Sequence, residues 1–480
     1  MDQIQDKIYK SRYLILFNVV MMTFMACLDG SIVNVTLPVM AKRLNITNEV
    51  VSWVVTAYLI AIAATILIFG RLGDIKGKAR VFMAGIILFT LGSLLCGISG
   101  SIYTLIGTRV LQAIGAACTM STSQGIITQI FPNNERGKAL GIVGTFVALG
   151  SLAGPPLGGF IVSTLSWQFI FLINVPIGIA TFAMSMKILP RNVVKSEEKL
   201  DAKGAILFTV AIVSLFGSII IGEGVGYAHP AIIAGFVIAV IAMTAFILME
   251  RKIKVPMLQL RIFENKLFSL SIFCGFITFI SISCSNIVQP FYLQDIMKLT
   301  PGMTGLIMMT YPLILVVVAP ASGHLSDKIG SEFLTFLGLL LTSAGLFLTA
   351  TLNEHSHIGS MILFIAIMSI GNGLFQSPNN SLIMSTVPRN MLGIAGSINS
   401  LIRNLGMVTG IALSTTLLYS GMSRKLGYHA STYVPGRDDA FVYGMRIVYI
   451  TAGIICVVGA LLTAWRLYGK KTGQQEIYQQ

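Results

Sequence analysis

The sequence predicts an all-α polytopic membrane protein built as two six-helix bundles with an inserted helix pair, giving fourteen transmembrane helices. Of its 480 residues, 55% are hydrophobic and only 11% are charged, whereas a soluble domain carries roughly 25% charged residues. Apolar segments of about 20 residues, long enough to cross a bilayer, recur along the chain. The hairpin Gly70–Gly77 also recurs as Gly323–Gly330, as expected for two copies of one bundle.

The spans are expected where apolar residues dominate over about a membrane thickness. They lie at approximately 13–37, 50–70, 80–99, 102–128, 137–163, 168–188, 204–222, 231–249, 267–291, 303–325, 332–351, 358–380, 391–418 and 442–466. Basic residues concentrate in alternate loops between these spans. This positive-inside pattern predicts that both termini are cytoplasmic.

The position of the repeated hairpins defines the domains. They follow the second and tenth spans, whereas two directly joined six-helix halves would place them after the second and eighth. The seventh and eighth spans are therefore an inserted pair, and its basic flanks place both of its ends in the cytoplasm. The predicted domains are an N-terminal six-helix bundle at 1–190, an inserted two-helix hairpin at 191–265 and a C-terminal six-helix bundle at 266–480.

Several function classes are disfavoured by the charged and reactive residues. The net charge of +14 comes from alternate loops and not from one basic surface, which argues against nucleic-acid binding. The six cysteines lie within apolar segments, so neither disulfides nor a metal site is expected. No phosphate-binding loop or dinucleotide fingerprint is present, and no cofactor is expected. The first span lacks a small-residue cleavage site and should be retained.

The repeated hairpins combine glycines with a carboxylate. Glycines permit a close approach of two helix ends, and an aspartate there can pair with an arginine or cap a helix. Such contacts would latch one conformation of a rocking bundle; the alternative is a plain cytoplasmic turn. The conformational hairpin residues are Gly70, Asp74 and Gly77 in the first copy and Gly323, Asp327 and Gly330 in the second.

Two charged residues lie within predicted spans. Asp29 is deep enough in the first span to be embedded, and an embedded carboxylate usually marks an ion path. Arg109 in the fourth span needs an anionic or backbone partner, for which Asp29 is a candidate. Burial and a nearby arginine act on a carboxylate in opposite directions, so conformation can control its protonation. Alternatively, the aspartate is structural and the arginine braces helix ends.

The fifth span carries closely spaced glycines and two prolines. Gly-x-x-x-Gly gives a flat surface for tight helix packing, and prolines kink a helix. The residues of this element are Gly150, Gly154, Pro155, Pro156, Gly158 and Gly159. The second half repeats the glycines at Gly406 and Gly410 but has no Gly-Pro-Pro. The element is therefore more than a part of the duplicated scaffold.

Other polar residues in the spans are candidates for a central substrate cavity or for interhelical hydrogen bonds. The candidate cavity residues are Asn34, Gln124, Asn286, Gln289, Asn372, Gln376, Asn399 and Arg403. Glu223 ends the seventh span and is expected to be an interfacial cap. The polar segment 419–441 is expected to be an outer loop.

Together these motifs resemble the major facilitator superfamily, in its fourteen-span drug/proton antiporter branch of the EmrB/QacA type. Leu28–Pro38 resembles the span-1 signature of that branch, Gly70–Arg80 the superfamily loop motif, and Arg109 with Gly115 the span-4 proton-coupling motif. Gly150–Gly159 resembles the antiporter motif, and Trp167–Gly178, with Asn174 and Pro176, continues the pattern. The resemblance covers essentially the whole chain.

The resemblance implies the major facilitator fold and a proton-coupled efflux transporter that exports lipophilic or cationic drugs by alternating access. The implied partners are a small-molecule substrate, protons and the lipid bilayer, with the chain acting as a monomer in the plasma membrane, the inner membrane of a bacterium. The alternative is a proton-coupled exporter of a lipid, peptide or metabolite. A membrane-embedded enzyme lacks a catalytic motif here, and twofold repeats fit alternating access better than a channel.

Overall fold

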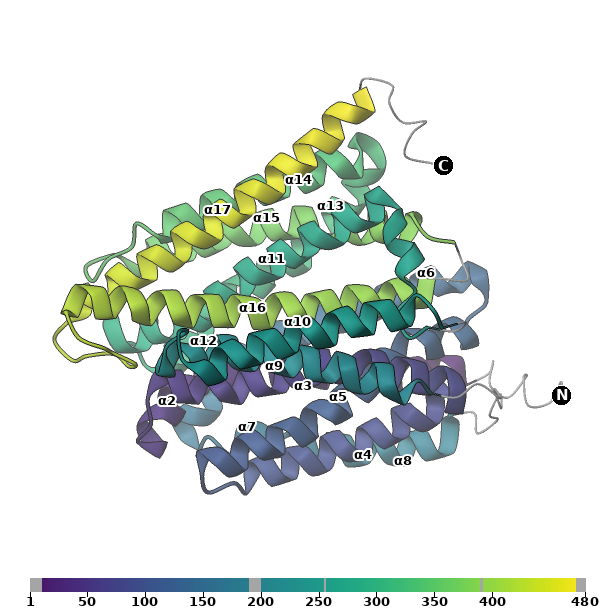
Figure 1. Cartoon of the computed structure of the whole chain (residues 1–480), viewed down its shortest axis with the longest axis horizontal. Helices are drawn as coiled ribbons and strands as arrows, with labels where there is room; N and C mark the ends of the chain where they lie inside the picture. Colours follow the sequence, from purple (N-terminus) through teal and green to yellow (C-terminus); the bar gives the residue numbers. More distant parts are fainter. Residues whose placement is uncertain (1–10, 190–199, 254–255, 389–391, 472–480) are drawn as a thin grey trace. The chain divides into compact units, whose positions relative to one another are not determined.

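The computed structural model describes residues 11–189, 200–253, 256–388 and 392–471 (Figure 1). Within these ranges the regular elements are helices, and no strand is assigned. The chain forms two compact units. Unit 1 comprises Met1–Asn45 and Val51–Leu258, and unit 2 comprises Ile46–Val50 and Gln259–Gln480. The three-part domain division expected from the sequence stays a prediction.

Unit 1 contains nine of the labelled helices, and two of them are the predicted inserted pair, α9 and α10. The helices are α2 (Arg12–Leu44), α3 (Asn48–Lys76), α4 (Lys78–Gly97), α5 (Ile102–Ile130), α6 (Asn133–Thr164), α7 (Phe169–Leu172), α8 (Asn174–Ile188), α9 (Ala202–Val225) and α10 (Pro230–Glu250). Within it, α2 packs on α6, α4 packs on α5, and α9 packs on α10.

Unit 2 repeats this plan without the inserted pair. Its elements are η1 (Leu260–Glu264), α11 (Lys266–Phe291), η2 (Tyr292–Ile296), α12 (Pro301–Met308), α13 (Thr310–Ile329), α14 (Ser331–Thr349), α15 (Ile358–Ser385), α16 (Leu392–Leu426) and α17 (Asp438–Lys471). Here α11 packs on α16 and α14 packs on α15. These pairs correspond to α2 with α6 and α4 with α5 in unit 1.

Matching glycine contacts show the duplication at the level of single residues. A Cβ atom added to Gly92 of α4 would lie 2.7 Å from Cβ of Gln112 on α5. A Cβ atom added to Gly345 of α14 would lie 2.8 Å from Cβ of Met368 on α15. Only glycine allows such an approach, so the two helix pairs cross at equivalent points.

The two repeated hairpins also share a backbone conformation. Gly77 has φ 99° and directly precedes α4, and Gly330 has φ 90° and directly precedes α14. Positive φ is strained for residues with a side chain, which explains a glycine at both turns. The duplicated sequence therefore builds a duplicated turn.

Two predicted spans each consist of two consecutive helices, and the junction comes shortly before a proline. The sixth span divides at Ile173 into α7 and α8, and the tenth divides at Met309 into α12 and α13. Pro176 and Pro312 follow three residues later. Proline has no N–H to donate to the carbonyl four residues before it, so one backbone hydrogen bond is missing there. Ile173 and Met309 keep right-handed helical φ and ψ, so each span continues through the junction.

Among the described residues, twelve helices are long and apolar enough to cross a membrane, judged by length and composition. The chain is therefore a polytopic helical membrane protein, but fourteen spans stay a prediction. Two of the predicted spans, now α5 and α6, do not reach that criterion although they have 29 and 32 residues. In α5 the reason is a set of buried polar residues, including Arg109 and Gln112, that lowers its hydropathy.

The expected outer loop 419–441 is shorter than predicted. Helix α16 continues to Leu426 and α17 begins at Asp438. Gly427, with φ 80°, follows the last residue of α16 and provides the left-handed conformation that often ends a helix. The side chain of Glu223, the expected interfacial cap, lies outside the described residues.

Candidate functional site: a buried charge cluster in unit 1

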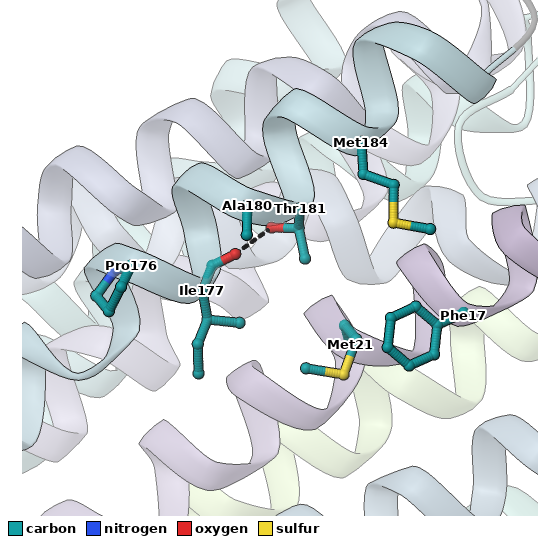
Figure 2. Close-up of a pocket in the computed structure, with 7 residues that line it drawn as sticks. All are labelled: Phe17, Met21, Pro176, Ile177, Ala180, Thr181 and Met184. Carbon is teal, nitrogen blue, oxygen red and sulfur yellow. Dashed lines mark hydrogen bonds between the residues drawn. The ribbon is translucent and has the colours of Figure 1, made fainter.

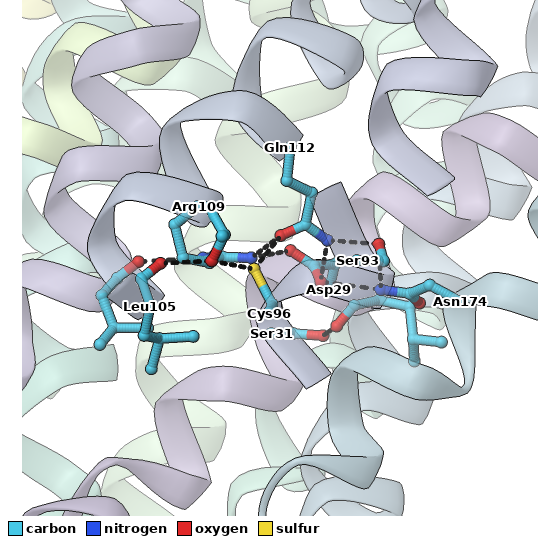
Figure 3. A network of polar contacts seen from close by, with 11 residues as sticks. Asp29, Ser31, Ser93, Cys96, Leu105, Arg109, Gln112 and Asn174 are labelled. Atoms are coloured by element: carbon cyan, nitrogen blue, oxygen red, sulfur yellow. Dashed lines mark hydrogen bonds and ion pairs between the residues drawn. The ribbon is translucent and has the colours of Figure 1, made fainter. Parts of the chain in front are cut away.

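Asp29 of α2 and Arg109 of α5 form an ion pair inside unit 1 (Figure 3). Nη1 of Arg109 lies 2.5 Å from Oδ2 of Asp29, and both side chains are fully buried, with 0% exposed. Asp29 and Arg109, which the sequence suggested as partners, are therefore paired in the structure. A buried pair is stable only when its hydrogen bonds are well made, because removing both charges from water is unfavourable.

Two amide side chains complete the hydrogen bonding of the carboxylate. Nε2 of Gln112, one turn after Arg109 on α5, donates to Oδ1 of Asp29 at 2.9 Å. Nδ2 of Asn174, from α8, donates to the same oxygen at 2.9 Å. Both amides also donate to Oγ of Ser93 on α4, at 2.8 Å and 3.4 Å. The three N–H donors fit an ionised carboxylate, which accepts hydrogen bonds at both oxygens.

The guanidinium of Arg109 is held on its other sides by α3 and by aromatic rings. Its Nε donates to the carbonyl of Val54 at 3.0 Å. Its Cζ lies 4.0 Å from the ring centroid of Tyr58 and 5.4 Å from that of Phe171, a cation–π arrangement. Nη2 is buried without a hydrogen-bond partner. The arginine is thus fixed, and Asp29 is its anionic partner.

The described residues of unit 2 lack this cluster although they share the helix crossings. Met368 occupies the position of Gln112, as their equivalent glycine contacts show. One turn earlier, Ile365 stands where α5 has Arg109. Helix α11, the counterpart of α2, contains no acidic residue within Lys266–Phe291. The charge cluster is therefore a specific feature of unit 1 and not part of the duplicated scaffold.

The hairpin residues lie at the helix ends that the sequence indicated. Asp74 pairs with Lys78, with Oδ1 and Nζ 2.6 Å apart, so its partner is a lysine on the following helix. A Cβ atom on Gly70 would make ordinary contact with Ser121 of α5. In the second copy, one on Gly323 would lie 2.9 Å from Oγ of Ser377 on α15. The side chain of Asp327 lies outside the described residues, and the role of these hairpins as latches stays a prediction.

The glycines of the fifth predicted span form the contact between α6 and α2. An added Cβ would lie 2.6 Å from the carbonyl oxygen of Phe24 at Gly150, 2.9 Å from N of Ile32 at Gly154, and 2.7 Å from the carbonyl oxygen of Ile32 at Gly158. The other residues predicted for this element lie on the same helix: Pro155, Pro156 and Gly159. Backbone-to-backbone contact of this kind excludes any side chain on the stripe.

Unit 2 makes a similar contact between α16 and α11. A Cβ atom on Gly406 would lie 2.9 Å from the carbonyl oxygen of Phe276, and one on Gly410 would lie closer still to that of Ile280. The glycine stripe is therefore duplicated, whereas the Gly-Pro-Pro sequence at Gly154 is not.

The candidate cavity residues are distributed over both units. Asn34 and Gln124 belong to unit 1, and the other six belong to unit 2: Asn286, Gln289, Asn372, Gln376, Asn399 and Arg403. Asn372 stands out because its side chain is 1% exposed and neither its Nδ2 nor its Oδ1 has a hydrogen-bond partner. Gln289 donates to Ser285 at 2.5 Å, and Asn399 donates to Asn380 at 3.1 Å. A common cavity for the eight stays a prediction.

An apolar pocket of about 330 Å³ lies between α2 and α8 (Figure 2). Its lining residues are Phe17, Met21, Pro176, Ile177, Ala180, Thr181 and Met184. The hydroxyl of Thr181 donates to the carbonyl of Ile177 at 2.9 Å, so it is not left for a ligand. None of the predicted site residues lines this pocket.

Sequence reasoning found the two charges of the cluster but missed the neutral groups around them. Gln112 lies between Arg109 and Gly115 of the span-4 motif but was not itself predicted, and Asn174 was named only within the pattern Trp167–Gly178. Ser93 and Tyr58 were not predicted. A signal was available for Gln112, because residues three apart on a helix share a face, and Arg109 already marked that face. Ser93 and Tyr58 give no such signal, because hydroxyls and tyrosines occur in many spans.

Comparisons with known proteins identify the family to which the chain is similar. A model of the Major Facilitator Superfamily matches residues 19–257 and 271–478. The riboflavin transporter RibZ of Clostridioides difficile (strain 630) is 34% identical over 95% of this chain and 98% of its own. The uncharacterized transporter YebQ of Escherichia coli (strain K12) is 35% identical over 85% of this chain and 89% of its own. The multidrug resistance protein Stp of Mycobacterium tuberculosis (strain H37Rv) is 29% identical over 86% and 77%.

A solved structure gives the same result for the fold. The crystal structure of the peptide transporter POT in complex with sulfate matches 94% of each chain with a TM-score of 0.66 and 15% sequence identity. With this similarity and the family match over both units, the chain belongs to the major facilitator superfamily and is a multi-pass membrane transporter of small molecules, not an enzyme.

Proposed function

We propose that this chain is a proton-coupled exporter that works by alternating access. The observation that carries the proposal is the fully buried Asp29–Arg109 ion pair. Ionisable residues within membrane spans are unfavourable unless paired, and they commonly belong to ion or proton pathways. The pair's absence from the equivalent positions of unit 2 supports a functional role over a scaffolding one.

The cluster has the chemistry needed to link protonation to conformation. While Arg109 and the two amides contact Asp29, the carboxylate is stabilised in its charged form. A conformation that separates Asp29 from Arg109 would leave a buried charge unpaired, so the carboxylate would then take up a proton. A proton is thus bound in one conformation and released in the other, which is the requirement for coupled transport.

We further propose that the transporter belongs to the fourteen-span antiporter branch. The inserted pair α9–α10 and the α2–α6 contact at Gly154 support this assignment. In this arrangement the chain is a monomer with three parts, and both termini lie in the cytoplasm, on the side of the basic loops. The membrane is the cell membrane of a bacterium, the source of each of the relatives named above.

Two substrate classes are proposed. Lipophilic or cationic drugs come first, because Stp and the multidrug transporter protein MdtP of Bacillus subtilis (strain 168), which is 29% identical, are named for multidrug transport. A metabolite such as riboflavin is the second candidate, because RibZ is named a riboflavin transporter and is similar over nearly its whole length. The motifs of the charge cluster do not separate these classes.

The test is a transport screen in inverted membrane vesicles with an imposed proton gradient. Uphill accumulation of a cationic dye or of riboflavin that collapses when a protonophore removes the gradient would support coupling and identify the class. Downhill movement of every substrate, unaffected by the gradient, would contradict proton coupling.

A further inference from the structure

Asn174 contacts the charge cluster from α8, whereas Arg109 and Gln112 lie on α5. Figure 3 shows its side chain reaching Asp29 on the side away from the arginine. Its Nδ2 donates to Oδ1 of Asp29 at 2.9 Å, and its side chain is 1% exposed. Its other polar atom, Oδ1, is buried and has no hydrogen-bond partner. A buried unpaired acceptor is unfavourable and calls for an explanation.

The unpaired oxygen is explained by the two protonation states of Asp29. An amide offers N–H donors at one end and an acceptor oxygen at the other. The NH₂ end suits the carboxylate that the structure contains, and the oxygen has nothing to accept from. When Asp29 binds a proton, its new O–H needs an acceptor, and a rotated Asn174 amide supplies one.

Gln112 cannot take over that second role while the arginine is in place. Its Oε1 accepts from Nη1 of Arg109 at 2.6 Å, and its Nε2 is shared by Asp29 and Ser93. Both ends of this amide are therefore occupied. Asn174 is the amide of the cluster with a free acceptor.

The position of Asn174 in the chain also allows it to move. It is the first residue of α8, directly after Ile173, which joins α7 to α8 with helical φ and ψ. Pro176, two residues later, cannot donate to the carbonyl of Leu172. Proline-interrupted positions are where helices bend. A change in the angle between α7 and α8 would therefore shift Asn174 relative to Asp29 before it shifted the two residues on α5.

We propose that Asn174 is a positioning residue for the proton on Asp29: its amide donates to the charged carboxylate, rotates to accept from the protonated acid, and transmits bending at the proline-weakened α7–α8 junction to proton uptake. The inference deepens the proposed function and rests on it. The only covalent change is a proton transfer: an O–H bond of a hydronium ion breaks as the O–H bond of Asp29 forms, and a water molecule is left.

The test is an infrared titration of the purified protein, which needs no substrate. The carbonyl band of protonated Asp29 is identified by its loss in the Asp29→Asn variant, and its midpoint is measured against pH. Asn174→Leu should move the midpoint to higher pH by about one unit, because hydrogen bonds to a charged group are stronger than those to a neutral one. It should also move the band itself to higher frequency, because the acid loses its acceptor.

Asn18 provides the matched control. This buried asparagine also ties α2 to α8, since it donates to the carbonyl of Thr181 at 2.8 Å and accepts from Ser185 at 2.9 Å. These hydrogen bonds go to α8 and not to Asp29, so Asn18→Leu should weaken the same helix contact and leave the midpoint unchanged. If Asn174→Leu does not fold, Asn174→Ala removes the same amide with a smaller change of shape and carries the same expectation.

Three results would overturn the inference: an unchanged midpoint and band in the Asn174 variants, an equal shift in Asn18→Leu, or no titration of Asp29 in the unchanged protein. The proposed function fails on a different measurement, namely uphill proton-driven transport by Asp29→Asn. The two failures are therefore distinguishable.

Discussion

A side chain added at Gly154 is expected to separate α6 from α2. A Cβ atom at this position would lie 1.8 Å from Oγ of Ser31, 2.7 Å from its Cβ and 2.9 Å from N of Ile32. Real side chains do not approach so closely. Rotation of the serine relieves the first contact, but the backbone nitrogen of Ile32 moves only if the helix moves.

The size of the effect follows from these contacts. Inserting atoms into a packed helix interface typically costs about 1–3 kcal/mol. If one conformation of the transport cycle depends on the α2–α6 contact, the same free energy changes its population by roughly 5- to 150-fold. Gly154→Val should therefore weaken export and increase proton leak without substrate, because the helices no longer close against each other.

The assay measures substrate efflux and proton flux on the same vesicles, with thermal unfolding of the purified variants as a stability reference. Gly217 of α9 gives the control, because nothing lies within 4 Å of a Cβ atom added there, so Gly217→Ala should behave as the unchanged protein. Adding Ser31→Gly to Gly154→Ala removes the nearest clash and should restore part of the lost activity.

Wild-type efflux and wild-type proton flux in Gly154→Val would refute this reasoning. The α6 element would then be a packing scaffold only. A variant that unfolds at a lower temperature but transports normally would show that the α2–α6 contact stabilises the fold and has no role in the transport cycle.

Two further predictions concern other parts of the chain. If the repeated hairpins act as latches, neutralising either aspartate should change how accessible introduced cysteines are from the two sides of the membrane. The variants are Asp74→Asn, which removes the pair with Lys78, and Asp327→Asn. Identical labelling in the unchanged protein and in both variants would show that the hairpins are ordinary turns. Both polar atoms of the Asn372 side chain are buried and unpaired, so Asn372→Leu should leave the free energy of unfolding unchanged or raise it by up to about 1–3 kcal/mol. If the amide binds substrate, the variant should also raise the substrate KM, and an unchanged KM would remove Asn372 from the substrate site. The control is Asn379→Leu, which should be destabilising because the amide of Asn379 donates to the carbonyl of Ser271 at 3.1 Å.

The parts of the fold that the sequence predicted are those set by local patterns. Long apolar runs and the repeated hairpin were sufficient for the helical bundles and their duplication. Gly77 and Gly330 adopt positive φ at equivalent turns, as a repeated glycine suggests. The number of spans is less direct, because buried polar residues such as Arg109 and Gln112 lower the hydropathy of α5 below that of the other spans.

The charge cluster was partly predictable for a similar reason. A carboxylate and an arginine in otherwise apolar spans each require a partner, so Asp29 and Arg109 could be matched from the sequence. Asn174 could not, because amides serve as interhelical hydrogen-bond donors at many positions. Its contact with Asp29 depends on how α8 packs against α2, and residues 145 positions apart are brought together only by the tertiary structure.

The partner of Asp74 was not specified by the type of residue alone. An arginine or a helix N-terminus was expected, whereas the structure pairs this carboxylate with Lys78, across the turn at Gly77. The left-handed backbone at this glycine turns the chain so that residues on consecutive helices face each other. A pattern based on residue type alone does not specify which of several nearby basic residues the turn selects.

The central claim, that Asp29 couples proton movement to export, is tested most directly by uphill transport in inverted vesicles with an imposed proton gradient. Asp29→Asn should reach the membrane and keep downhill substrate exchange, because asparagine has the shape of aspartate, but with a lower unfolding temperature, because it leaves the buried charge of Arg109 unpaired. It should lose all gradient-driven accumulation, because an amide does not bind and release a proton near neutral pH. Full gradient-driven accumulation by Asp29→Asn would contradict the account.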